Sequence, residues 1–376
     1  MWFEIVCSNC GNVLSYDFKG WCCPKCGSTL TIRYELKQSK LPRWGWKGGI
    51  EGFKDFIPCN CKLYSLGECW TPLLKVQLKG LNLYLKLEHV NPTGSFKDRG
   101  AVVSVSRAKS LGVKRVREDS SGNAGISTSA YASRARLKAK IYVPHDAPKP
   151  KKALIKAFGG EIVEAPSRDE ASKLVVKGLG SDEMYIGHLW DPYFIEGVKT
   201  LTYELYLQLG LNVDYIVVPV ASGTLLLGVY RGLQDLMSLG LIENQPKLIA
   251  VQAQGYSVLH SFITNEPIGE VKTKVADALR VSNPPRLKEM VNAIRATDGL
   301  TTVVEDDRII KAHRILARKG LLVEPTSATT LAAVLKLREN NHITSRDKAV
   351  LVLTGSGIKT LDKTYWLLKQ TLKAPQ

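Results

Sequence analysis

Apolar and polar positions alternate with two different periodicities, that of strands and that of helices, over most of this chain. Leu81, Leu83, Leu85 and Leu87 recur at every second position, which is the spacing of a strand. Short runs rich in β-branched residues predict further strands at 141–143, 161–163, 215–218, 247–252 and 349–353. Stretches with helical spacing alternate with these strands, at 151–158, 168–179, 196–209, 225–239, 306–318 and 328–339.

This alternation predicts an α/β fold in which parallel sheets are covered by helices. Ligands of open parallel sheets collect at the carboxyl ends of the strands. Four unusual segments of the sequence follow predicted strands, and the strand before the segment at 120–125 is predicted at 114–117. We therefore interpret these four segments as parts of one site.

The first segment is Asn91-Pro-Thr-Gly-Ser-Phe-Lys-Asp-Arg-Gly100. Its proline and glycine break the chain, and Ser95 is placed to cap a helix that begins near Phe96. Lys97 then lies in the first helical turn, where the helix dipole disfavours an ammonium group and lowers its pKa. A lysine with a lowered pKa is a better nucleophile and can form a Schiff base. The alternative, for a lone lysine, is an ordinary surface residue after a turn.

The other three segments are turns rich in small and hydroxyl residues. The 120–125 turn, Ser-Ser-Gly-Asn-Ala-Gly, offers hydroxyls and helix N-terminal amides to a carboxylate, and Asn123 adds a side-chain donor. The 219–226 turn curls backbone N–H groups around a phosphate, but it lacks the Gly-Lys-Ser/Thr of a nucleotide-triphosphate loop. The 353–359 turn, Leu-Thr-Gly-Ser-Gly-Ile-Lys, offers a neutral hydroxyl to a heteroaromatic nitrogen. Each turn alone is equally compatible with a plain connection.

Four cysteines near the N-terminus have the spacing of a metal site. Cys7-x2-Cys10 and Cys23-x2-Cys26 are two pairs, and each pair is followed by a glycine. Two such turns bring four thiolates to one zinc ion in a closed tetrahedral site, which is structural because it leaves no open position. Two disulfides are the alternative.

The remaining cysteines have no such pattern. Cys22 competes with Cys23, although its spacing to Cys26 is one residue too long. Cys59, Cys61 and Cys69 lack a clear partner set, and we expect ordinary thiols there.

Composition excludes several classes of protein. The 376 residues are 44% hydrophobic and 23% charged, as in a soluble globular protein. We expect no membrane association, because no apolar run approaches the roughly 20 residues of a membrane span. The N-terminus lacks the features of a secretory signal, so we expect a cytoplasmic protein.

The net charge of +17 is large, but its lysines and arginines are scattered. Of the denser basic clusters, 149–156 has no aromatic residue and 359–373 has only the adjacent pair Tyr365 and Trp366, which we expect to pack one face of a helix. We therefore expect no nucleic-acid partner despite the four-cysteine segment and the positive charge. We interpret the excess of positive charge as a solvated surface, and the electric field of this surface also attracts an anionic small molecule.

A reactive lysine, a phosphate site, a carboxylate site and a neutral hydroxyl together suit pyridoxal phosphate that holds an amino acid. The chain resembles the tryptophan-synthase-β-like, fold type II enzymes that depend on this cofactor, and within them the threonine synthase family. The resemblance extends from about Thr71 to Lys359. It is carried by NPTGSFKDRG, IEGVKT (195–200), VEPTSA (323–328) and LTGSGIK (353–359). An N-terminal zinc ribbon is also common in that family.

The resemblance implies a role for each matching residue. Lys97 would be the catalytic residue, joined to the cofactor as a Schiff base and moving protons at the substrate carbons. Asn123 would bind the phenolic oxygen of the cofactor, and Thr354 would face its pyridine nitrogen. The cofactor phosphate would be bound by Ala221, Ser222, Gly223, Thr224 and Leu225. The substrate would be bound by Ser120, Ser121, Asn123 and Ala124.

The resemblance also implies an architecture. We expect two open, mostly parallel α/β subdomains with the cofactor site in the cleft between them, plus a small N-terminal zinc ribbon. The ribbon would comprise residues 1–40 and the catalytic region residues 41–376. The large subdomain would span roughly 46–90 and 200–376, and the small one roughly 91–199. A homodimer is expected.

The implied reaction converts O-phospho-L-homoserine and water to L-threonine and phosphate. In better-known bacterial relatives an arginine stands where this chain has Phe194, and an asparagine where it has Asp191. A ring cannot pair with a phosphate dianion and a carboxylate repels it, so Lys199, Arg99 or His188 would have to compensate. The alternative is β-elimination or β-replacement on serine, threonine or O-phosphoserine by an enzyme of the same family.

Overall fold

The structure is a computed structural model that describes residues 1–37, 40–42 and 49–372. Residue 46, where the large subdomain was predicted to begin, lies outside the described residues, as do residues 373–376 at the end of the predicted catalytic region. The chain forms two compact units. Unit 1 comprises residues 1–70, 91–211 and 227–245, and unit 2 comprises residues 71–90, 212–226 and 246–376. The predicted subdomain boundaries and the predicted cleft stay predictions.

Unit 1 contains two sheets. The N-terminal sheet is antiparallel, with the order β2-β1-β3, and the second sheet is parallel, with the order β8-β7-β6-β9. The strands are β1 (Phe3–Cys7), β2 (Val13–Leu14), β3 (Leu30–Tyr34), β6 (Arg115–Glu118), β7 (Lys138–Pro144), β8 (Glu161–Ala165) and β9 (Glu183–Tyr185).

The helices of unit 1 pack on these sheets and on one another. Helices α2 and α4 contact β7, α3 contacts β8, and α1 packs along α5. The helices are η1 (Gly49–Phe56), α1 (Lys97–Ser110), α2 (Asn123–Arg134), α3 (Lys149–Ala157), α4 (Arg168–Val176), α5 (Pro192–Val198), α6 (Thr200–Leu209) and most of α7 (Thr224–Ser238).

Unit 2 contains one sheet of the order β12-β11-β10-β13-β5-β4, parallel except for the antiparallel edge strand β4. Its central strands are nearly continuous apolar runs because helices cover them, and Val217, Ile249 and Leu351 are fully buried. The strands are β4 (Leu73–Leu78), β5 (Leu81–Lys86), β10 (Tyr215–Pro219), β11 (Lys247–Ala253), β12 (Leu300–Val304) and β13 (Lys348–Val352).

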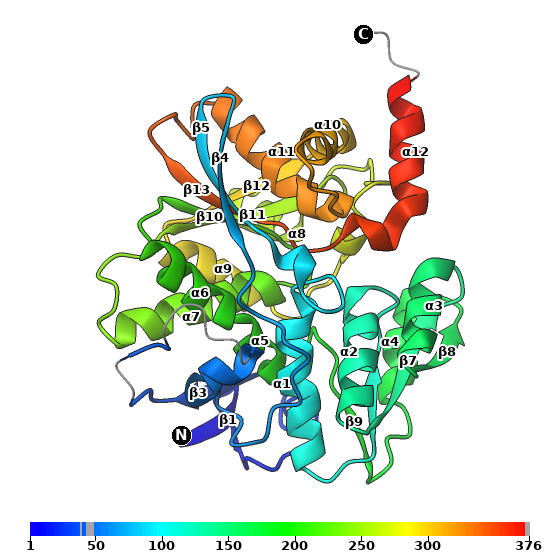
Figure 1. Ribbon diagram of the computed structural model, residues 1–376. Helices are drawn as coiled ribbons and strands as arrows, with labels where there is room; N and C mark the ends of the chain where they lie inside the picture. The colour runs from blue at the N-terminus through cyan, green and yellow to red at the C-terminus, as the bar shows by residue number, and fades with distance from the viewer. Residues whose placement is uncertain (38–39, 43–48, 373–376) are drawn as a thin grey trace. The chain divides into compact units, whose positions relative to one another are not determined.

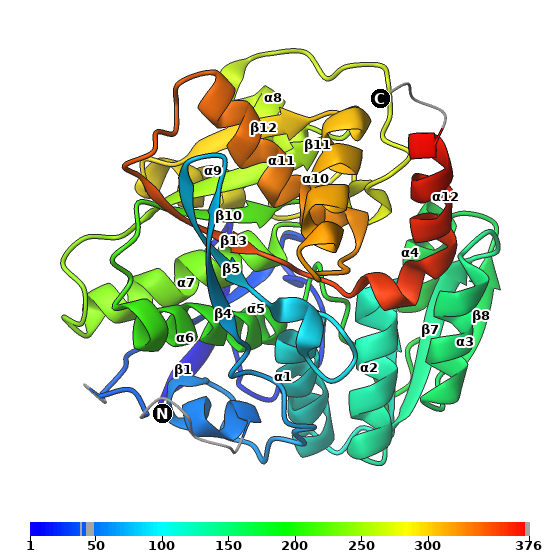
Figure 2. The same ribbon diagram turned by 45° about the horizontal axis from the view of Figure 1, so that its top comes forward.

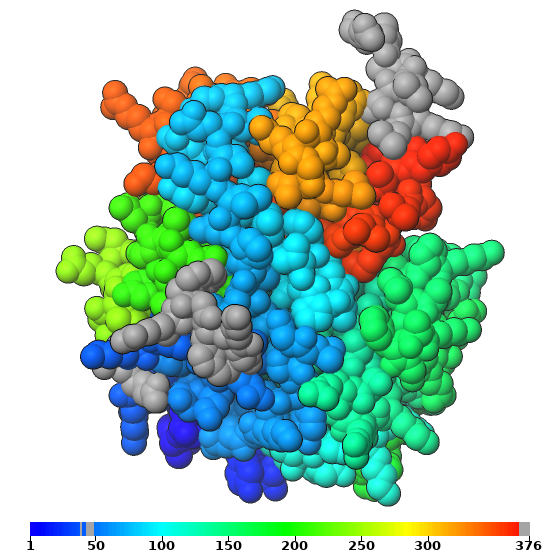
Figure 3. Space-filling model, viewed as in Figure 1, coloured from blue at the N-terminus to red at the C-terminus, as the bar shows by residue number. Residues whose placement is uncertain are grey.

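The helices of unit 2 include α11, which packs against β10, β11, β12 and β13 and against α10. Helix α12 ends the described chain at the surface (Figure 3), where the side chain of Tyr365 is exposed. The helices are η2 (Glu88–Val90), the first turn of α7, α8 (Val258–Thr264), η3 (Asp277–Leu279), α9 (Leu287–Ala296), α10 (Asp306–Arg318), α11 (Pro325–Glu339), η4 (Gly357–Thr360) and α12 (Leu361–Leu372).

The α/β prediction is confirmed, and one predicted element is wrong. The single helix expected at 196–209 is two helices, α5 and α6, which meet at Lys199. Helix α5 begins earlier because Asp191 caps it, accepting a hydrogen bond from the Tyr193 amide at 3.0 Å, and Pro192 occupies the first helical position. Asp191 therefore has a structural role as a helix cap, which the comparison with the asparagine of bacterial relatives did not reveal.

Candidate functional site

The four cysteines with metal-site spacing converge in the N-terminal sheet. The Sγ atoms of Cys7, Cys10, Cys23 and Cys26 all lie within 4.8 Å of one another. Three of the Sγ–Sγ separations are 3.5 to 3.7 Å, close to the roughly 3.8 Å edge of a tetrahedron with 2.3 Å zinc–sulfur bonds. The donor set therefore fits a structural zinc ion. Cys22 is not part of this group.

The two tight turns have the geometry that the glycines predict. Gly11 and Gly27 adopt φ angles of +69° and +70°, a region that favours glycine. The amides of Asn9 and Cys10 donate to Cys7 Sγ, each at 3.4 Å.

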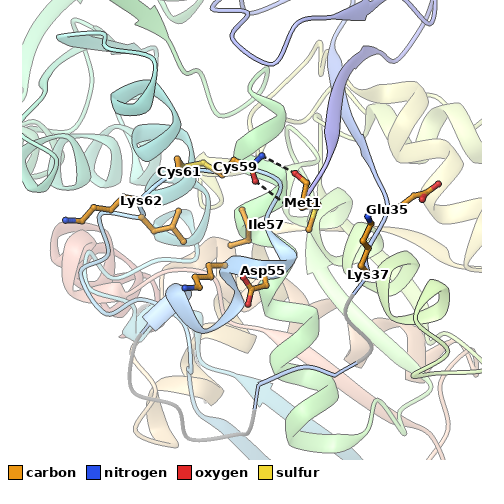
Figure 4. Close-up of a pocket in the computed structure, with 11 residues that line it drawn as sticks. Met1, Glu35, Lys37, Asp55, Ile57, Cys59, Cys61 and Lys62 are labelled. Carbon is orange, nitrogen blue, oxygen red and sulfur yellow. Dashed lines mark hydrogen bonds between the residues drawn. A yellow bond between two sulfur atoms is a disulfide. The ribbon is translucent and has the colours of Figure 1, made fainter.

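The expectation of ordinary thiols is wrong for two of the other cysteines. Cys59 and Cys61 form a disulfide, because a single residue separates them and the turn brings their Cα atoms to 5.2 Å. Figure 4 shows this disulfide on the wall of a pocket of about 530 Å³, which is lined by residues of the first 63 positions and by none of the predicted site residues. Cys69 is a buried thiol 3.5 Å from Thr200 Oγ1.

The loop before Lys97 is fixed by the next residue, Asp98. Its carboxylate accepts hydrogen bonds from the Thr93 amide at 2.7 Å and from the Ser127 hydroxyl at 2.5 Å. The prediction that Ser95 caps the helix is wrong. Helix α1 begins at Lys97 without a side-chain cap, and the buried Ser95 hydroxyl has no hydrogen-bond partner among the described residues.

Lys97 is buried beside two aromatic rings. Its Nζ lies 4.8 Å from the Phe96 ring centroid and 5.3 Å from that of Phe194. Burial lowers the pKa of Lys97 to about 7, and the charge of Glu118 opposes part of this shift. The predicted direction is therefore confirmed, but the main cause is loss of water around the ammonium group rather than the helix dipole.

The 120–125 turn leads into α2. Asn123 is the first residue of the helix, so Ala124 and its neighbours present first-turn amides that have no partner within the helix. The Gly122 amide bonds to Ser120 Oγ at 3.2 Å. Gly125 is required by close packing, because a Cβ there would lie 2.0 Å from Ser120 O.

Two acidic residues next to this turn, Glu118 and Asp119, were missed in the sequence, and the third residue described here, His188, was considered only as a partner for a substrate phosphate. Glu118 ends β6 and is fully buried, and His188 Nδ1 lies 2.8 Å from its Oε1. Asp119 accepts hydrogen bonds from the hydroxyls of Ser172 at 2.6 Å and Tyr185 at 2.7 Å. Two acids directly after an apolar strand position were the available signal, since acids are seldom buried without partners.

Each of the three candidate cations has an acidic partner, and that of His188 is Glu118, 2.8 Å from its Nδ1. Arg99 is buried 2.6 Å from Glu204 Oε1, and Lys199 is buried 2.6 Å from Glu196 Oε2. His188 is the one that belongs to the Lys97 environment, with its ring centroid 6.0 Å from that of Phe194.

In unit 2, the 219–226 turn follows β10 and opens α7. Gly223 adopts φ +88°, and a Cβ there would lie 2.3 Å from Met290 Sδ. The Ser222 and Thr224 hydroxyls lie 3.3 Å apart at the start of this 15-residue helix. A helix N-terminus preceded by a left-handed glycine is a geometry that favours anions, and the phosphate role of this turn stays a prediction.

The 353–359 turn follows β13, the strand that pairs with β10. Thr354 Oγ1 lies 3.0 Å from Ser327 Oγ, which accepts a hydrogen bond from the Gly355 amide at 2.9 Å. Because β10 and β13 are parallel neighbours, this hydroxyl and the phosphate-sized turn lie at the same edge of the sheet. The structure thus groups Ala221–Leu225 with Thr354 in unit 2, and Lys97 with the 120–125 turn in unit 1.

Comparison with known proteins agrees with this chemistry. Residues 64–355 match the family described as pyridoxal-phosphate dependent enzymes. The chain belongs to this family. The pyridoxal-phosphate dependent relatives include threonine synthase of Methanocaldococcus jannaschii, 30% identical over 98% of this chain and 95% of that protein, and threonine synthase of Halalkalibacterium halodurans, 31% identical over 84% and 90%.

Solved structures of pyridoxal-phosphate dependent enzymes share the fold. Maize serine racemase matches with a TM-score of 0.66 and 25% identity, over 81% of this chain and 94% of that one. A pyridoxal 5'-phosphate-dependent aspartate racemase matches with a TM-score of 0.68 and 25% identity, over 84% and 97%.

The residues of this pyridoxal-phosphate dependent enzyme fit the cofactor. Within unit 1, Lys97 supplies an amine whose pKa is lowered to about 7. Within unit 2, the N-terminus of α7 suits an anion, and Thr354 supplies a neutral hydroxyl. Of the helices in the described part of the chain, none is both long and apolar enough to cross a membrane.

Proposed function

We propose that this enzyme is a threonine synthase, which converts O-phospho-L-homoserine and water to L-threonine and phosphate. The observation that carries the proposal is the similarity to threonine synthases over nearly the whole chain, at 30% identity to the Methanocaldococcus jannaschii protein over 98% of this chain.

Bound pyridoxal phosphate supplies an electron sink that stabilises negative charge at the α carbon of an amino acid. We assign Lys97 to bind the cofactor's aldehyde carbon and to move protons at the substrate carbons. Asn123 binds the phenolic oxygen. Thr354 donates to the pyridine nitrogen and, unlike a carboxylate, holds no proton on it.

The two turns divide the anionic groups between them. Ala221, Ser222, Gly223, Thr224 and Leu225 bind the cofactor phosphate through the N-terminus of α7. Ser120, Ser121, Asn123 and Ala124 bind the substrate carboxylate through the first turn of α2. Both helices are long enough to present a full first turn of amides, 15 and 12 residues respectively.

We also propose that Cys7, Cys10, Cys23 and Cys26 bind one structural zinc ion. Four thiolates complete its coordination, so no position remains for a substrate. A homodimer without nucleic-acid partners completes the proposal.

The decisive experiment supplies the purified enzyme with pyridoxal phosphate and then, separately, with O-phosphohomoserine, threonine and O-phosphoserine. Threonine and inorganic phosphate from the first substrate alone support the proposal. The Lys97→Ala variant should remain colourless and inactive, whereas Lys109→Ala, on the same helix, should keep colour and turnover. Colourless wild-type protein would refute the cofactor assignment itself.

A second candidate is supported by Phe194. Its ring occupies the surroundings of Lys97 where some relatives have an arginine for the substrate phosphate, and Arg99 and Lys199 are bound to other acids. This environment suits elimination from serine, threonine or O-phosphoserine. Formation of 2-oxobutyrate from threonine, without phosphate release from O-phosphohomoserine, would establish this candidate and overturn the first.

A further inference from the structure

The disulfide between Cys59 and Cys61 closes a very short loop. Only Asn60 separates the two cysteines, and their Cα atoms lie 5.2 Å apart. A disulfide stabilises a fold mainly by restricting the unfolded chain, and this effect grows with the length of the closed loop. A loop of so few residues restricts the unfolded chain little. The bond therefore contributes little to the stability of the fold, and a chemical role is the better explanation for it.

Hydrogen bonds hold the turn that carries this disulfide. The Cys59 amide donates to the Ile57 carbonyl at 2.8 Å. Asn60 adopts a φ of +48°, in the left-handed region that asparagine tolerates better than most residues. Its side-chain amide donates to the Met1 carbonyl at 3.0 Å, a contact that Figure 4 marks with a dashed line. None of these contacts uses a sulfur atom, so we expect the turn to keep the two cysteines close together when the disulfide is open.

The two cysteines differ in their access to solvent. Cys59 is buried, with 5% of its surface exposed, whereas Cys61 is half-buried. A thiolate that attacks a disulfide bonds to one sulfur and expels the other as a thiolate. Cys61 is therefore the sulfur that an incoming thiolate reaches, and Cys59 is the protected thiol that can close the bond again.

The disulfide lies on the wall of a pocket that can hold a small molecule. Its volume of about 530 Å³ is within the roughly 300–1,000 Å³ of small-molecule sites. Every residue that lines it belongs to unit 1 and to the first 63 positions. A small thiol that enters this pocket meets the disulfide without contacting any residue assigned to the catalytic site.

The lining of the pocket favours a negatively charged thiol. Lys37, Lys54 and Lys62 line it with exposed side chains, against the two acids Glu35 and Asp55, in a protein whose net charge is +17. A cleft with an excess of positive charge raises the local concentration of anions and speeds their association. Nearby lysines also favour the thiolate over the thiol, and the thiolate is the nucleophile in disulfide exchange.

We propose that the Cys59–Cys61 pair is a thiol–disulfide exchange site for a low-molecular-weight thiol that carries carboxylates. The protein would thus be reversibly modified at Cys61, outside the site that binds pyridoxal phosphate. The site is carried by the short loop, the difference in access between the two sulfurs and the lysine-lined pocket.

The exchange proceeds in two steps. The thiolate of the small thiol attacks Cys61 Sγ and forms a mixed disulfide there, and the electron pair of the broken bond leaves on Cys59 Sγ, which takes up a proton from water. A second small thiolate then attacks the sulfur of the first small thiol, releases the disulfide of the two and leaves Cys61 as a thiolate, which is protonated in turn. The protein gains two electrons, and the two small thiols lose them. Attack of the Cys59 thiolate on the mixed disulfide reverses the first step.

The test exposes the full-length protein, purified without reductant, to reduced glutathione as the anionic thiol. Rapid alkylation and mass mapping of the peptide with residues 59–61 then follow the disulfide and keep it separate from the other cysteines. The disulfide should be lost, and the trapped glutathione adduct should lie on Cys61 and not on Cys59. This measurement needs no variant, so it stands even if a substitution prevents folding.

Two single substitutions test which sulfur is attacked. With oxidised glutathione, Cys59→Ser should acquire one glutathione on Cys61. Cys61→Ser should acquire one on Cys59 at least about tenfold more slowly, because burial raises the pKa of a thiol and each pKa unit lowers its thiolate fraction about tenfold. Equal rates in the two variants would overturn the assignment of Cys61 as the reactive sulfur.

A triple substitution tests the charge of the pocket. Lys37→Ala, Lys54→Ala and Lys62→Ala together should slow the reduction by glutathione at low salt about tenfold. Reduction by cysteamine, a cationic thiol, should not become slower in this variant.

The matched control removes the same charge elsewhere in unit 1. Lys114→Ala, Lys138→Ala and Lys156→Ala together remove three exposed lysines that do not line the pocket, and the glutathione rate should stay within about twofold of wild type. An equal loss of rate in both triple variants would overturn the role of this pocket in selecting an anion.

The remaining outcomes are equally direct. A disulfide that glutathione leaves intact in the folded protein, but reduces in urea, would overturn the exchange site. Reduction by a protein dithiol alone would overturn the choice of a small thiol. The assay needs neither pyridoxal phosphate nor an amino-acid substrate, so its failure would leave the proposed function unaffected, and failure of that function would leave this inference unaffected.

Discussion

At the scale of single residues, Lys97 combines a proposed function with a cost to the stability of the fold. Its side chain is buried beside Phe96 and Phe194, and a buried amine is disfavoured in its charged form. The folded pKa of about 7 lies below the ordinary value of 10.5, so the unfolded chain binds more protons between these two values. The contribution of Lys97 to stability therefore rises as the pH rises from about 7 to 10.5.

Replacing Lys97 by methionine should stabilise the cofactor-free protein. Methionine has a similar length and no charge to bury, and the gain should be greatest below pH 7, at about 2–5 kcal/mol. Urea unfolding of both proteins at an acidic and an alkaline pH measures the difference. A methionine variant that is less stable than wild type at acidic pH would contradict the burial of the ammonium group.

Glu118 should contribute a pH dependence of the opposite sign. Its folded pKa of about 8 lies above the ordinary 4.5, so the folded chain binds more protons between these values and its stability contribution falls as pH rises through them. Glu118→Gln should flatten the stability profile over this range. Urea unfolding of the cofactor-free variant across the range detects the effect, and a slope equal to that of wild type would count against it.

At the scale of elements, helices α1 and α5 depend on two glycines for their close approach. A Cβ on Gly197 would lie 1.9 Å from the carbonyl oxygen of Arg99, and a Cβ on Gly100 would lie 2.3 Å from the ring of Phe194. The first contact is with backbone and the second with a side chain. The two helices that carry Lys97 and Phe194 are thus held at a separation that only glycine allows.

The Gly197→Ala variant should lose about 3 kcal/mol of unfolding free energy, because α5 must move away from α1. Gly269→Ala is the matched control, since a Cβ there meets nothing within 4 Å, and it should change stability by no more than about 0.5 kcal/mol. Chemical denaturation measures both. Equal unfolding free energies for Gly197→Ala and Gly269→Ala would show that α1 and α5 can move apart without loss of stability.

Much of the element pattern could be predicted from periodicity alone. Helix α10 begins and ends where the sequence pattern predicts, and the strand that begins at Tyr215 is also as expected. Both were predictable because a buried face requires apolar residues at a regular spacing. The break at Lys199 was missed because the helical spacing continues across it. The site was predictable where small residues and turns mark it, but Glu118 and His188 are brought together by a strand pairing between β6 and β9 that no local pattern encodes.

At the scale of the whole molecule, the ribbon is tied to the catalytic region by side chains within unit 1. Trp21 packs edge-on against Trp190 at 4.6 Å and Tyr185 at 5.9 Å. Tyr185 in turn donates to Asp119, the residue before the 120–125 turn. The segment that holds the four cysteines is therefore connected to the 120–125 turn through Trp21 and Tyr185.

Adjacent cysteines provide a direct test of the zinc assignment. Cys23→Ser should lose bound zinc and several degrees of melting temperature, whereas Cys22→Ser should keep one zinc ion per chain because Cys22 lies outside the cluster. Atomic absorption and thermal denaturation measure the two properties. If Cys23→Ser retained zinc and Cys22→Ser lost it, Cys22 rather than Cys23 would be the zinc ligand.

Tyr34, at the end of the third strand, has a ring 4.2 Å from the Lys199 ammonium and 4.4 Å from the Arg231 guanidinium. Its hydroxyl also donates to Asp235 at 2.9 Å. A variant that lacks residues 1–34 would leave the cations Lys199 and Arg231 and their acidic partners exposed to solvent on one side. The first forty residues are therefore needed for the rest of unit 1 to fold. We expect that a shortened gene, which encodes the catalytic portion alone, will yield aggregated protein.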